Sequence, residues 1–518
     1  MVNQRTTADT AAEVREGYAF TGPALRLGAL VVDGKGDPST QVRIPLSMIN
    51  RHGLVAGATG TGKTKTLQGM AEQLSTAGVP VFLADIKGDL SGMAAPGVVN
   101  EKITARAAEI GADWQPTAYP VEFFALGGHG TGVPVRATIT SFGPTLLAKV
   151  LSLNAVQESS LGLVFHFADN NGLPLLDIKD LRAVIQYLIS EEGTEALSGL
   201  GGLSKATAGV ILRELIAFSD AGADAFFGEP EFDTRDFLRT TPDGRGIVNV
   251  LELPNLLDKP ALFSTFLMWF LADLFHDLPE IGDVDKPKLV FFFDEAHLLF
   301  KDASKDFLAA ITQTVRLIRS KGVGVFFVTQ TPKDVPADVL AQLGNRVQHA
   351  LRAYTPEDAK ALKATVSTFP KSGYDLAEVL THLGIGEAVV TVLSERGGPT
   401  PVAWTMLPPP RSLMAQLDPA TADATVKASP LLPKYGAAVD RESAYERLAA
   451  KVLPPAEPAA RRAPGHEPPE PAQRRREEKG VLEQVLGAPA VRGMVRSAAT
   501  AAGREIIRSI FGTARRRR

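Results

Sequence analysis

The fold of this chain is decided by the stretch Gly53-Leu54-Val55-Ala56-Gly57-Ala58-Thr59-Gly60-Thr61-Gly62-Lys63-Thr64. A short apolar run leads into GATGTGKT, which matches the phosphate-loop pattern G-x-x-x-x-G-K-[ST] at every fixed position. The glycines of this pattern let the backbone curl so that its N–H groups point at phosphate oxygens. The sequence therefore predicts a strand, a phosphate-binding loop and a helix in succession.

The residues of the loop have distinct predicted roles. Lys63 supplies a positive charge to the β- and γ-phosphates, and the hydroxyl of Thr64 is a ligand for Mg²⁺. The run from Lys63 to Gln73 is expected to form a helix whose positive N-terminus faces the same anion. The flanking strand and helix patterns disfavour the alternative of a glycine-rich turn that matches by chance. The predicted nucleotide-contacting residues are Gly57, Ala58, Thr59, Gly60, Thr61, Gly62, Lys63, Thr64 and Lys65.

A pair of acids, Asp294 and Glu295, stands at the end of the clearest central strand in the sequence, KLVFFFD over Lys288 to Asp294. An Asp at the carboxyl end of a strand beside a phosphate loop can hold Mg²⁺ through water. The next residue, Glu295, can polarise the attacking water as a general base. Two acids at the start of a helix are the simpler interpretation, but the upstream phosphate loop favours Asp294 as metal ligand and Glu295 as catalytic base.

Other polar side chains are candidates for the γ-phosphate. The apolar run Val323 to Thr329 ends in Gln330, whose amide can both donate and accept a hydrogen bond. An arginine from a neighbouring subunit often stabilises the transition state of phosphoryl transfer. Arg319 is the predicted arginine finger, with Arg316 and Arg346 as alternatives, although a surface cation is the simpler interpretation of each.

Composition narrows the class of protein. The chain has 518 residues, 45% hydrophobic residues and no cysteine, which excludes disulfides, thiolate metal sites and a cysteine nucleophile. The N-terminus is polar, and the apolar stretch from Ala261 to Phe275 is short enough to be read as a buried helix. A cytoplasmic protein is therefore expected. The eight histidines show no metal-ligand spacing.

Alternating strand and helix patterns imply a doubly wound α/β fold with a mainly parallel sheet. Expected strands include Val79 to Asp85, Ile247 to Leu253, Arg346 to Arg352 and Ala388 to Leu393. The expected organisation is a short β prelude over 1–50, a core over 51–93 and 246–408, a mostly helical insertion over 94–245, and a helical extension over 409–453. Residues 454–518, with 14 basic and 7 acidic side chains, read as a disordered proline-rich linker and a basic tail.

Taken together, these motifs resemble the HerA/FtsK superfamily of ATPases. RHGLVAGATGTGKT is similar to the HerA phosphate loop, and FLADIKGDLSG is similar to a strand that ends in Asp-x-Lys-Gly in HerA and in conjugative ATPases. LVFFFDEAHLL, RLIRSKGVG and a strand ending in Thr-Gln follow in the same order. The nearest resemblance is to the bacterial HerA-like family typified by YjgR.

The resemblance implies a RecA-like core in which Lys63, Thr64, Asp294, Glu295 and Gln330 serve ATP and Mg²⁺. It also implies a homo-oligomer, a hexameric ring, that uses ATP hydrolysis to move DNA or peptide through a pore, with a DNA translocase or helicase-like motor as the leading hypothesis. HerA carries an N-terminal barrel that residues 1–50 do not match. The nuclease partner typical of HerA is therefore not expected.

Three other classes of function compete with this one. One alternative is a membrane-associated or scaffold ATPase that remodels a protein assembly. The basic tail favours it, because its arginines could contact an acidic partner or an anionic membrane. These arginines are Arg492, Arg496, Arg504, Arg508 and Arg515 to Arg518. The letters Asp-Glu-Ala-His suggest DEAH-box RNA helicases, but VTQTP stands where those enzymes need Ser-Ala-Thr. A phosphate-loop kinase or regulatory GTPase is weaker, because the chain lacks an Asn-Lys-x-Asp guanine motif.

Overall fold

The chain divides into two units that are discontinuous in sequence. The structure, a computed structural model, describes residues 7–127, 130–197, 199–253, 260–282, 284–300 and 305–452. The first unit comprises Met1–Arg136 and Pro230–Ala437, and the second comprises Ala137–Glu229 and the chain from Ala438 onward. The predicted linker and basic tail, 454–518, lie outside the described residues.

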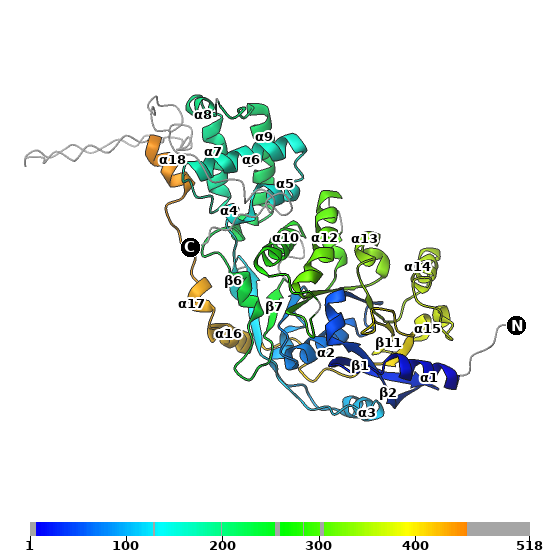
Figure 1. Cartoon of the computed structure of the whole chain (residues 1–518). Helices are drawn as coiled ribbons and strands as arrows, with labels where there is room; N and C mark the ends of the chain where they lie inside the picture. The colour runs from blue at the N-terminus through cyan, green and yellow to red at the C-terminus, as the bar shows by residue number, and fades with distance from the viewer. Residues whose placement is uncertain are drawn as a thin grey trace, which may run out of the picture. The chain divides into compact units, whose positions relative to one another are not determined.

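One sheet of 12 strands forms the centre of the first unit (Figure 1). Its spatial order is β2-β1-β12-β11-β10-β3-β9-β8-β4-β7-β5-β6. The strands are β1 (Ala24–Val32), β2 (Lys35–Pro45), β3 (Gly53–Ala56), β4 (Val81–Asp85), β5 (Val121–Leu126), β6 (Val133–Val135), β7 (Val248–Glu252), β8 (Leu289–Phe293), β9 (Val323–Thr329), β10 (Asn345–Gln348), β11 (Glu387–Thr391) and β12 (Ala403–Met406).

The direction of the strands determines where the loops meet. From β10 to β6 every neighbouring pair is parallel. From β10 outward to β2 the pairing is antiparallel. The expected mainly parallel, doubly wound sheet is confirmed. The loops that follow β10, β3, β9, β8 and β4 therefore lie along one edge, which is where ligands bind in such sheets.

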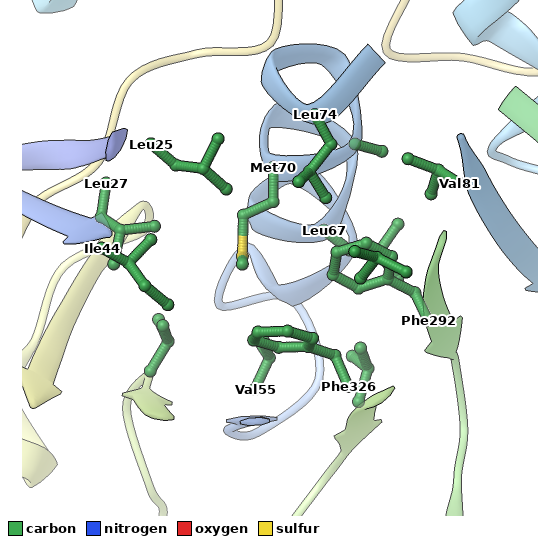
Figure 2. Close-up of a cluster of buried hydrophobic side chains, with 14 of the residues drawn as sticks. Leu25, Leu27, Ile44, Val55, Leu67, Met70, Leu74, Val81, Phe292 and Phe326 are labelled. Carbon is green, nitrogen blue, oxygen red and sulfur yellow. The ribbon is translucent and has the colours of Figure 1, made fainter. Parts of the chain in front are cut away.

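One face of the sheet packs against α2 (Lys63–Thr76), the helix that follows the phosphate loop. Figure 2 shows Leu67, Met70 and Leu74 of this helix directed at the sheet. Their partners include Val55 on β3, the strand just before the loop, and residues on strands further away in sequence: Phe292, Phe326, Leu25, Leu27 and Ile44. This contact fixes the start of the helix over the end of β3.

The opposite face is covered by aromatic side chains. Phe82 of β4 lies 5.2 Å from Phe291 of β8 and 4.9 Å from Phe270, measured between ring centroids. Phe270 belongs to α10 (Pro260–Asp277), and its ring also lies 4.6 Å from Phe237. Side chains of a strand alternate between the two faces, so burial on both sides explains the continuous apolar runs of β4 and β8.

The expected buried helix at Ala261 to Phe275 is α10, whose Phe266, Trp269 and Phe270 are buried. Among the described residues, no helix has the length and apolar character needed to cross a membrane. The other helical segments of the first unit are α1 (Thr7–Gly17), η1 (Leu46–Arg51), η2 (Ser91–Ala94), α3 (Glu101–Glu109), η4 (Thr234–Leu238), α11 (His297–Phe300), α12 (Lys305–Ile318), η6 (Arg319–Lys321), η7 (Pro332–Asp334), α13 (Ala337–Leu340), α14 (Pro356–Val366), α15 (Leu376–His382), α16 (Pro419–Lys427) and α17 (Leu432–Tyr435).

The described residues of the second unit form helices joined by loops, with two isolated β-bridges. Its elements are α4 (Ile139–Phe142), α5 (Pro144–Val150), α6 (Ala155–Asn170), α7 (Ile178–Leu188), α8 (Glu191–Ala196), α9 (Lys205–Asp220), η3 (Ala223–Ala225) and α18 (Ala444–Val452). The buried carboxylate of Asp180 on α7 accepts hydrogen bonds from the backbone N–H groups of Tyr445 (2.9 Å) and Leu176 (2.8 Å). This joins the C-terminal helix to the insertion.

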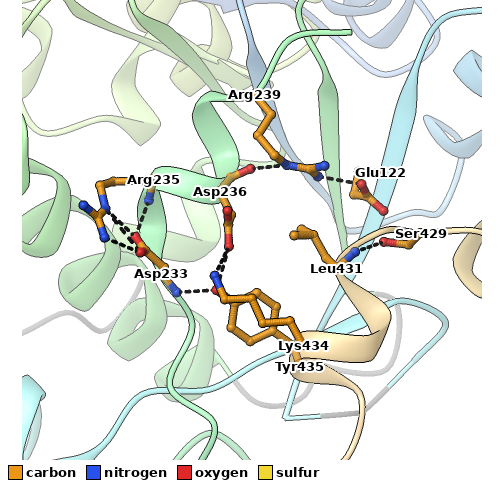
Figure 3. Close-up of polar contacts among 9 residues, drawn as sticks. All are labelled: Glu122, Asp233, Arg235, Asp236, Arg239, Ser429, Leu431, Lys434 and Tyr435. Atoms are coloured by element: carbon orange, nitrogen blue, oxygen red, sulfur yellow. Dashed lines mark hydrogen bonds and ion pairs between the residues drawn. The ribbon is translucent and has the colours of Figure 1, made fainter. Parts of the chain in front are cut away.

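Polar contacts hold α17 against the rest of the first unit (Figure 3). Lys434 and the hydroxyl of Tyr435, both on α17, donate to Asp236 at 2.8 and 2.6 Å. Arg239 forms an ion pair with Glu122 of β5 at 2.6 Å. The expected extension over 409–453 thus contacts η4 through its first part, and its last helix, α18, belongs to the second unit.

Two boundaries differ from those expected. β5 and β6 fall inside the region 94–245 that we expected to be an insertion, yet β5 pairs with β7 of the main sheet. The helical unit instead begins at Ala137. The partner of VEFFAL lies more than a hundred residues later in the sequence, so no local pattern reveals the pairing. Likewise the expected N-terminal β segment, residues 1–50, is not separate from the core, because β1 and β2 extend the same sheet.

Leu74→Ala should lower the free energy of unfolding by about 2–5 kcal/mol, since it leaves a cavity between α2 and the sheet. Leu74 is fully buried. The midpoint of chemical unfolding measures the effect. Val156→Ala on α6, where the side chain is exposed, is the control and should change stability by less than about 0.5 kcal/mol. Equal effects of the two substitutions would contradict the packing described.

Candidate functional site

The phosphate loop, residues 57–64, connects β3 to α2 at the carboxyl edge of the sheet. Gly62 precedes the helix with a φ of 111°, a left-handed conformation that a side chain rarely adopts. The ammonium of Lys63 is mostly buried and donates to the carbonyl oxygen of Ala58 at 3.1 Å. Burial lowers the pKa of Lys63, while the charges of Glu295 and Asp294 act in the opposite direction. The lysine therefore lies against its own loop, near both acids.

His349, which the sequence did not single out, packs against the base of this loop. Its backbone N–H donates to the carbonyl of Ala56 at 2.7 Å, and its Nε2 lies 2.9 Å from the hydroxyl of Thr66. A Cβ at Gly57 would meet the Cβ of His349 at 2.4 Å, which explains why glycine is required there. Burial, followed by the charge of Lys63, lowers the pKa of His349 to about 4. The imidazole is therefore neutral at neutral pH and supports the loop without adding charge.

Asp294 and Glu295 follow β8, two strands from the phosphate loop. Asp294 Oδ1 accepts the backbone N–H of Glu295 at 2.9 Å, whereas its buried Oδ2 has no hydrogen-bond partner among the described residues. Burial and the neighbouring charge of Glu295 raise the pKa of Asp294 to about 6. Such an unpartnered buried oxygen is what a metal ion or ordered water would satisfy.

Glu295 is held in a strained position. Its φ of 47° is uncommon for a residue with a side chain, and strain of this kind gathers at functional sites. Its Oε1 accepts a hydrogen bond from Lys87, and its buried Oε2 lies 3.3 Å from His297 Nδ1. Burial alone would raise the pKa of Glu295, but the hydrogen bond and charge of Lys87 lower it overall. The carboxylate is thus kept ionised, as a general base must be.

Lys87 is a second residue of the site to which sequence analysis gave no role. It follows β4 in the Asp-x-Lys-Gly segment, and the spacing alone did not show what it contacts. The same turn is shaped by Asp85, whose buried carboxylate accepts N–H groups of Gly88 (2.7 Å) and Leu90 (2.9 Å). Burial raises the pKa of Asp85 to about 6. The turn presents the Lys87 ammonium to Glu295.

Gln330 lies where the sequence placed it, directly after β9 at the edge beside the phosphate loop. The residue before it, Thr329, pairs with Ala56, and its carbonyl accepts the N–H of Gly57 at 3.2 Å. The side chain of Gln330 is exposed. The hydroxyl of Thr329 donates to Asp334 at 2.9 Å, which shapes the turn that follows.

The three candidate arginines lie away from this edge within the chain. Arg316 and Arg319 stand at the end of α12 and in η6, just before β9 begins, so the length of β9 separates them from Gln330. Arg346 is at the start of β10, and its guanidinium donates to the hydroxyl of Thr368 at 2.6 Å. The structure therefore brings none of them to the phosphate loop of its own subunit.

Two backbone segments flank the tip of the loop. The N–H of Ala58 donates to the carbonyl of Ala350 at 2.8 Å, and Arg352 donates to the carbonyl of Thr59 at 3.4 Å. On the other segment, the N–H of Gly386 donates to the carbonyl of Thr61 at 3.1 Å. Sequence analysis gave neither segment a role at the site, although it expected a strand over Arg346 to Arg352.

The site combines a backbone cradle at a helix N-terminus, a lysine, a strand-end Asp and a neighbouring ionised Glu. The cradle suits a polyphosphate. Hydroxyl and carboxylate oxygens from Thr64 and Asp294 are the ligand type that Mg²⁺ prefers. Among the described residues, no group of three or more His, Asp or Glu side chains could hold a metal ion by itself.

A phosphate loop after one parallel strand and an Asp-Glu pair two strands away define a phosphate-loop nucleotide-binding protein with a RecA-like core. The chain belongs to the HerA-like helicase family: residues 31–518 match the family model for the helicase HerA-like C-terminal domain. The family expected from the motifs is confirmed.

Curated relatives are similar over parts of their length. The DNA double-strand break repair helicase HerA of Sulfolobus acidocaldarius is 22% identical over 376 residues, covering 72% of this chain and 67% of that protein. The probable helicase MJECL08 of Methanocaldococcus jannaschii is 33% identical over 150 residues. That match spans 28% of each chain, so much of this relative has no counterpart in the alignment.

Among solved structures, the plasmid coupling protein TrwB in complex with ADP and Mg²⁺ is similar with a TM-score of 0.51 and 17% identity. The match covers 77% of this chain and 98% of that one. The unbound monoclinic form of the TrwB fragment gives a TM-score of 0.50 at 16% identity, covering 79% and 94%. At this level of identity the likeness supports the fold.

His349→Gln should flatten part of the pH dependence of stability. The pKa of His349 is about 4 in the folded chain and 6.5 ordinarily, so its neutral form stabilises the fold fully above about pH 6.5, and this contribution is lost progressively as the pH falls from about 6.5 to about 4. The difference in unfolding free energy between wild type and variant should shift by about 2 kcal/mol between pH 7 and 4.5. Chemical unfolding at both pH values measures this shift. His382→Gln, at an exposed histidine, should follow wild type; a constant His349→Gln difference would contradict the burial argument.

Proposed function

We propose that this protein is an ATP-hydrolysing motor that translocates along DNA or separates its strands. The observation that carries the proposal is the convergence of Lys63, Asp294 and Glu295 at one edge of the sheet, in a chain of the HerA-like family. A phosphate cradle alone binds nucleotide. An ionised, oriented carboxylate beside it adds the means to activate water.

Each residue has a defined task in this proposal. The N–H groups of the loop and the Lys63 ammonium bind the phosphates, and the N-terminus of α2 adds its dipole. Thr64 and Asp294 would hold Mg²⁺, and the ion would supply positive charge to offset that of the phosphates. Glu295, kept ionised by Lys87, accepts the proton of the attacking water, and Gln330 at the end of β9 orients that water.

DNA as substrate and ATP as fuel are supported by the relatives. The Sulfolobus relative is a DNA double-strand break repair helicase. Solved TrwB structures hold ADP with Mg²⁺, an ATP analogue and a GTP analogue. Because this chain shares the fold and the phosphate loop, we infer the same class of ligand and a homo-oligomeric ring as the working assembly.

The ring would also supply the missing arginine. Arg316 is exposed and Arg319 half-buried at the edge opposite the phosphate loop, so either could reach only the site of a neighbouring subunit. Arg319 remains our first choice as the finger. Arg346 is the weaker choice, because its guanidinium is already bonded to Thr368.

The basic tail suggests a recruitment role rather than a catalytic one. Residues 454–518 hold twice as many basic as acidic side chains, and such a segment can bind nucleic acid, an acidic protein or an anionic membrane surface. We infer that it tethers a cytoplasmic motor to one of these surfaces. The second candidate function, a motor that remodels a protein assembly at the membrane, rests on this segment.

Lys63→Ala should weaken ATP binding by about 10- to 100-fold through loss of a charged hydrogen-bond donor. Glu295→Gln should bind ATP normally but hydrolyse it about 10²- to 10⁴-fold more slowly. Binding is measured by titration with a fluorescent ATP analogue, and turnover by phosphate release. Lys205→Ala, at an exposed lysine of α9, is the control; wild-type turnover in Glu295→Gln would remove Glu295 from the mechanism.

DNA should stimulate ATP turnover, and its apparent affinity should fall more than about tenfold between 50 and 200 mM salt, because phosphate contacts release counterions. Phosphate release is measured with double-stranded DNA, single-stranded DNA and polyglutamate on protein whose assembly mass is known. A chain ending at Leu453 tests the tail in the same assay. Hydrolysis indifferent to DNA and RNA at low salt would reject the DNA motor and leave the assembly-remodelling function.

A further inference from the structure

Two large apolar side chains are exposed beside the phosphate loop. Tyr354 has 84% of its surface exposed and Ile385 has 76%, the two highest values among the large hydrophobic residues of the described chain. They stand more than thirty residues apart in sequence. Exposed apolar groups near a binding loop point to an apolar partner.

The first of them is carried by the segment that follows β10. This segment is bonded to the loop twice, from Ala58 to Ala350 at 2.8 Å and from Arg352 to Thr59 at 3.4 Å. Tyr354 comes two residues after Arg352, a span of at most about 7 Å in extended chain. Its exposed ring therefore belongs to the segment that these two bonds attach to the loop.

The second belongs to a tight turn before β11. The N–H of Gly386 bonds to the carbonyl of Thr61 at 3.1 Å. Arg106 of α3 donates to the carbonyls of Ile385 (3.4 Å) and Gly386 (3.3 Å), and Glu387 accepts the N–H of Gly384 at 3.1 Å. These bonds hold the turn in place, so Ile385 is exposed on a built structure beside the loop.

We propose that Tyr354 and Ile385 form the contact surface for the base of the bound nucleoside triphosphate. The inference rests on the proposed function, since it takes the phosphates to lie in the loop. A nucleotide held there must extend its ribose and base past the loop, and the two segments that carry these exposed side chains are both bonded to that loop. An aromatic ring stacks on any base, and an aliphatic side chain packs against its face or edge.

This surface has a consequence for specificity. Stacking and apolar contact depend on the area of a base rather than on its hydrogen-bonding edge. The site should thus favour purines over pyrimidines while binding adenine and guanine nucleotides with affinities within about tenfold of each other. The cellular abundance of each purine nucleotide would then mainly decide which one the motor hydrolyses.

The test compares two ligands that share phosphates and differ in the nucleoside: a non-hydrolysable ATP analogue and inorganic tripolyphosphate, each with Mg²⁺. Calorimetric titration measures both affinities on the full chain. Tyr354→Ala should lower the affinity for the ATP analogue about tenfold, in the range found for loss of one base–aromatic stack. It should leave the affinity for tripolyphosphate unchanged. Tyr354→Phe should retain wild-type affinity, Ile385→Ser should behave like Tyr354→Ala, and Val156→Ala is the distant control.

The outcomes separate this inference from the proposed function. If the wild type binds neither ligand, the nucleotide site itself is wrong. If the wild type binds both ligands, and Tyr354→Ala either keeps both affinities or lowers both by the same factor, the base contact is wrong while the phosphate site stands. If Tyr354→Ala lowers the assembly mass at unchanged analogue affinity, these side chains form a subunit interface, which also overturns the inference.

Discussion

Parallel pairing of β3 with β9 and β10, and of β9 with β8, is the constraint on which the rest of this structure depends. It aligns the carboxyl ends of these strands, so residues more than two hundred positions apart in sequence meet at one edge. The pairing is stabilised by side chains packed on both faces, with α2 on one and the aromatic groups around Phe82 and Phe270 on the other. A shift of one residue in β8 would exchange these faces and misplace Asp294.

Charge is concentrated where this edge is most buried. Asp294 and Glu295 are adjacent acids in a buried setting, an arrangement that costs free energy unless cations balance it. Lys87 supplies that balance for Glu295, and Lys63 lies close enough to influence both. Burial, followed by the charge of Glu295, raises the pKa of Asp294, so its ionised form is disfavoured in this setting. A site of this kind trades stability for function.

The antiparallel strands beyond β10 serve the site indirectly. β11 and β12 extend the sheet, and the turn before β11 bonds to the phosphate loop through Gly386 and Thr61. The loop is thereby supported from the side opposite the acids, with His349 filling the space beneath Gly57. The phosphate loop thus has β8, the strand that precedes the two acids, on one side of β3 and the β10 and β11 segments on the other.

Local patterns predict the phosphate loop, the acids and Gln330 at strand ends, and the doubly wound class, because glycine spacing, apolar runs and the residues that end them are visible in the sequence. The strand pairing, the start of the helical unit at Ala137 and the contacts of Lys87, His349, Arg352 and the Gly386 turn are visible only in the folded chain. The reason is physical. Their roles arise from contacts between distant segments, such as Lys87 with Glu295, and no local pattern encodes such a contact.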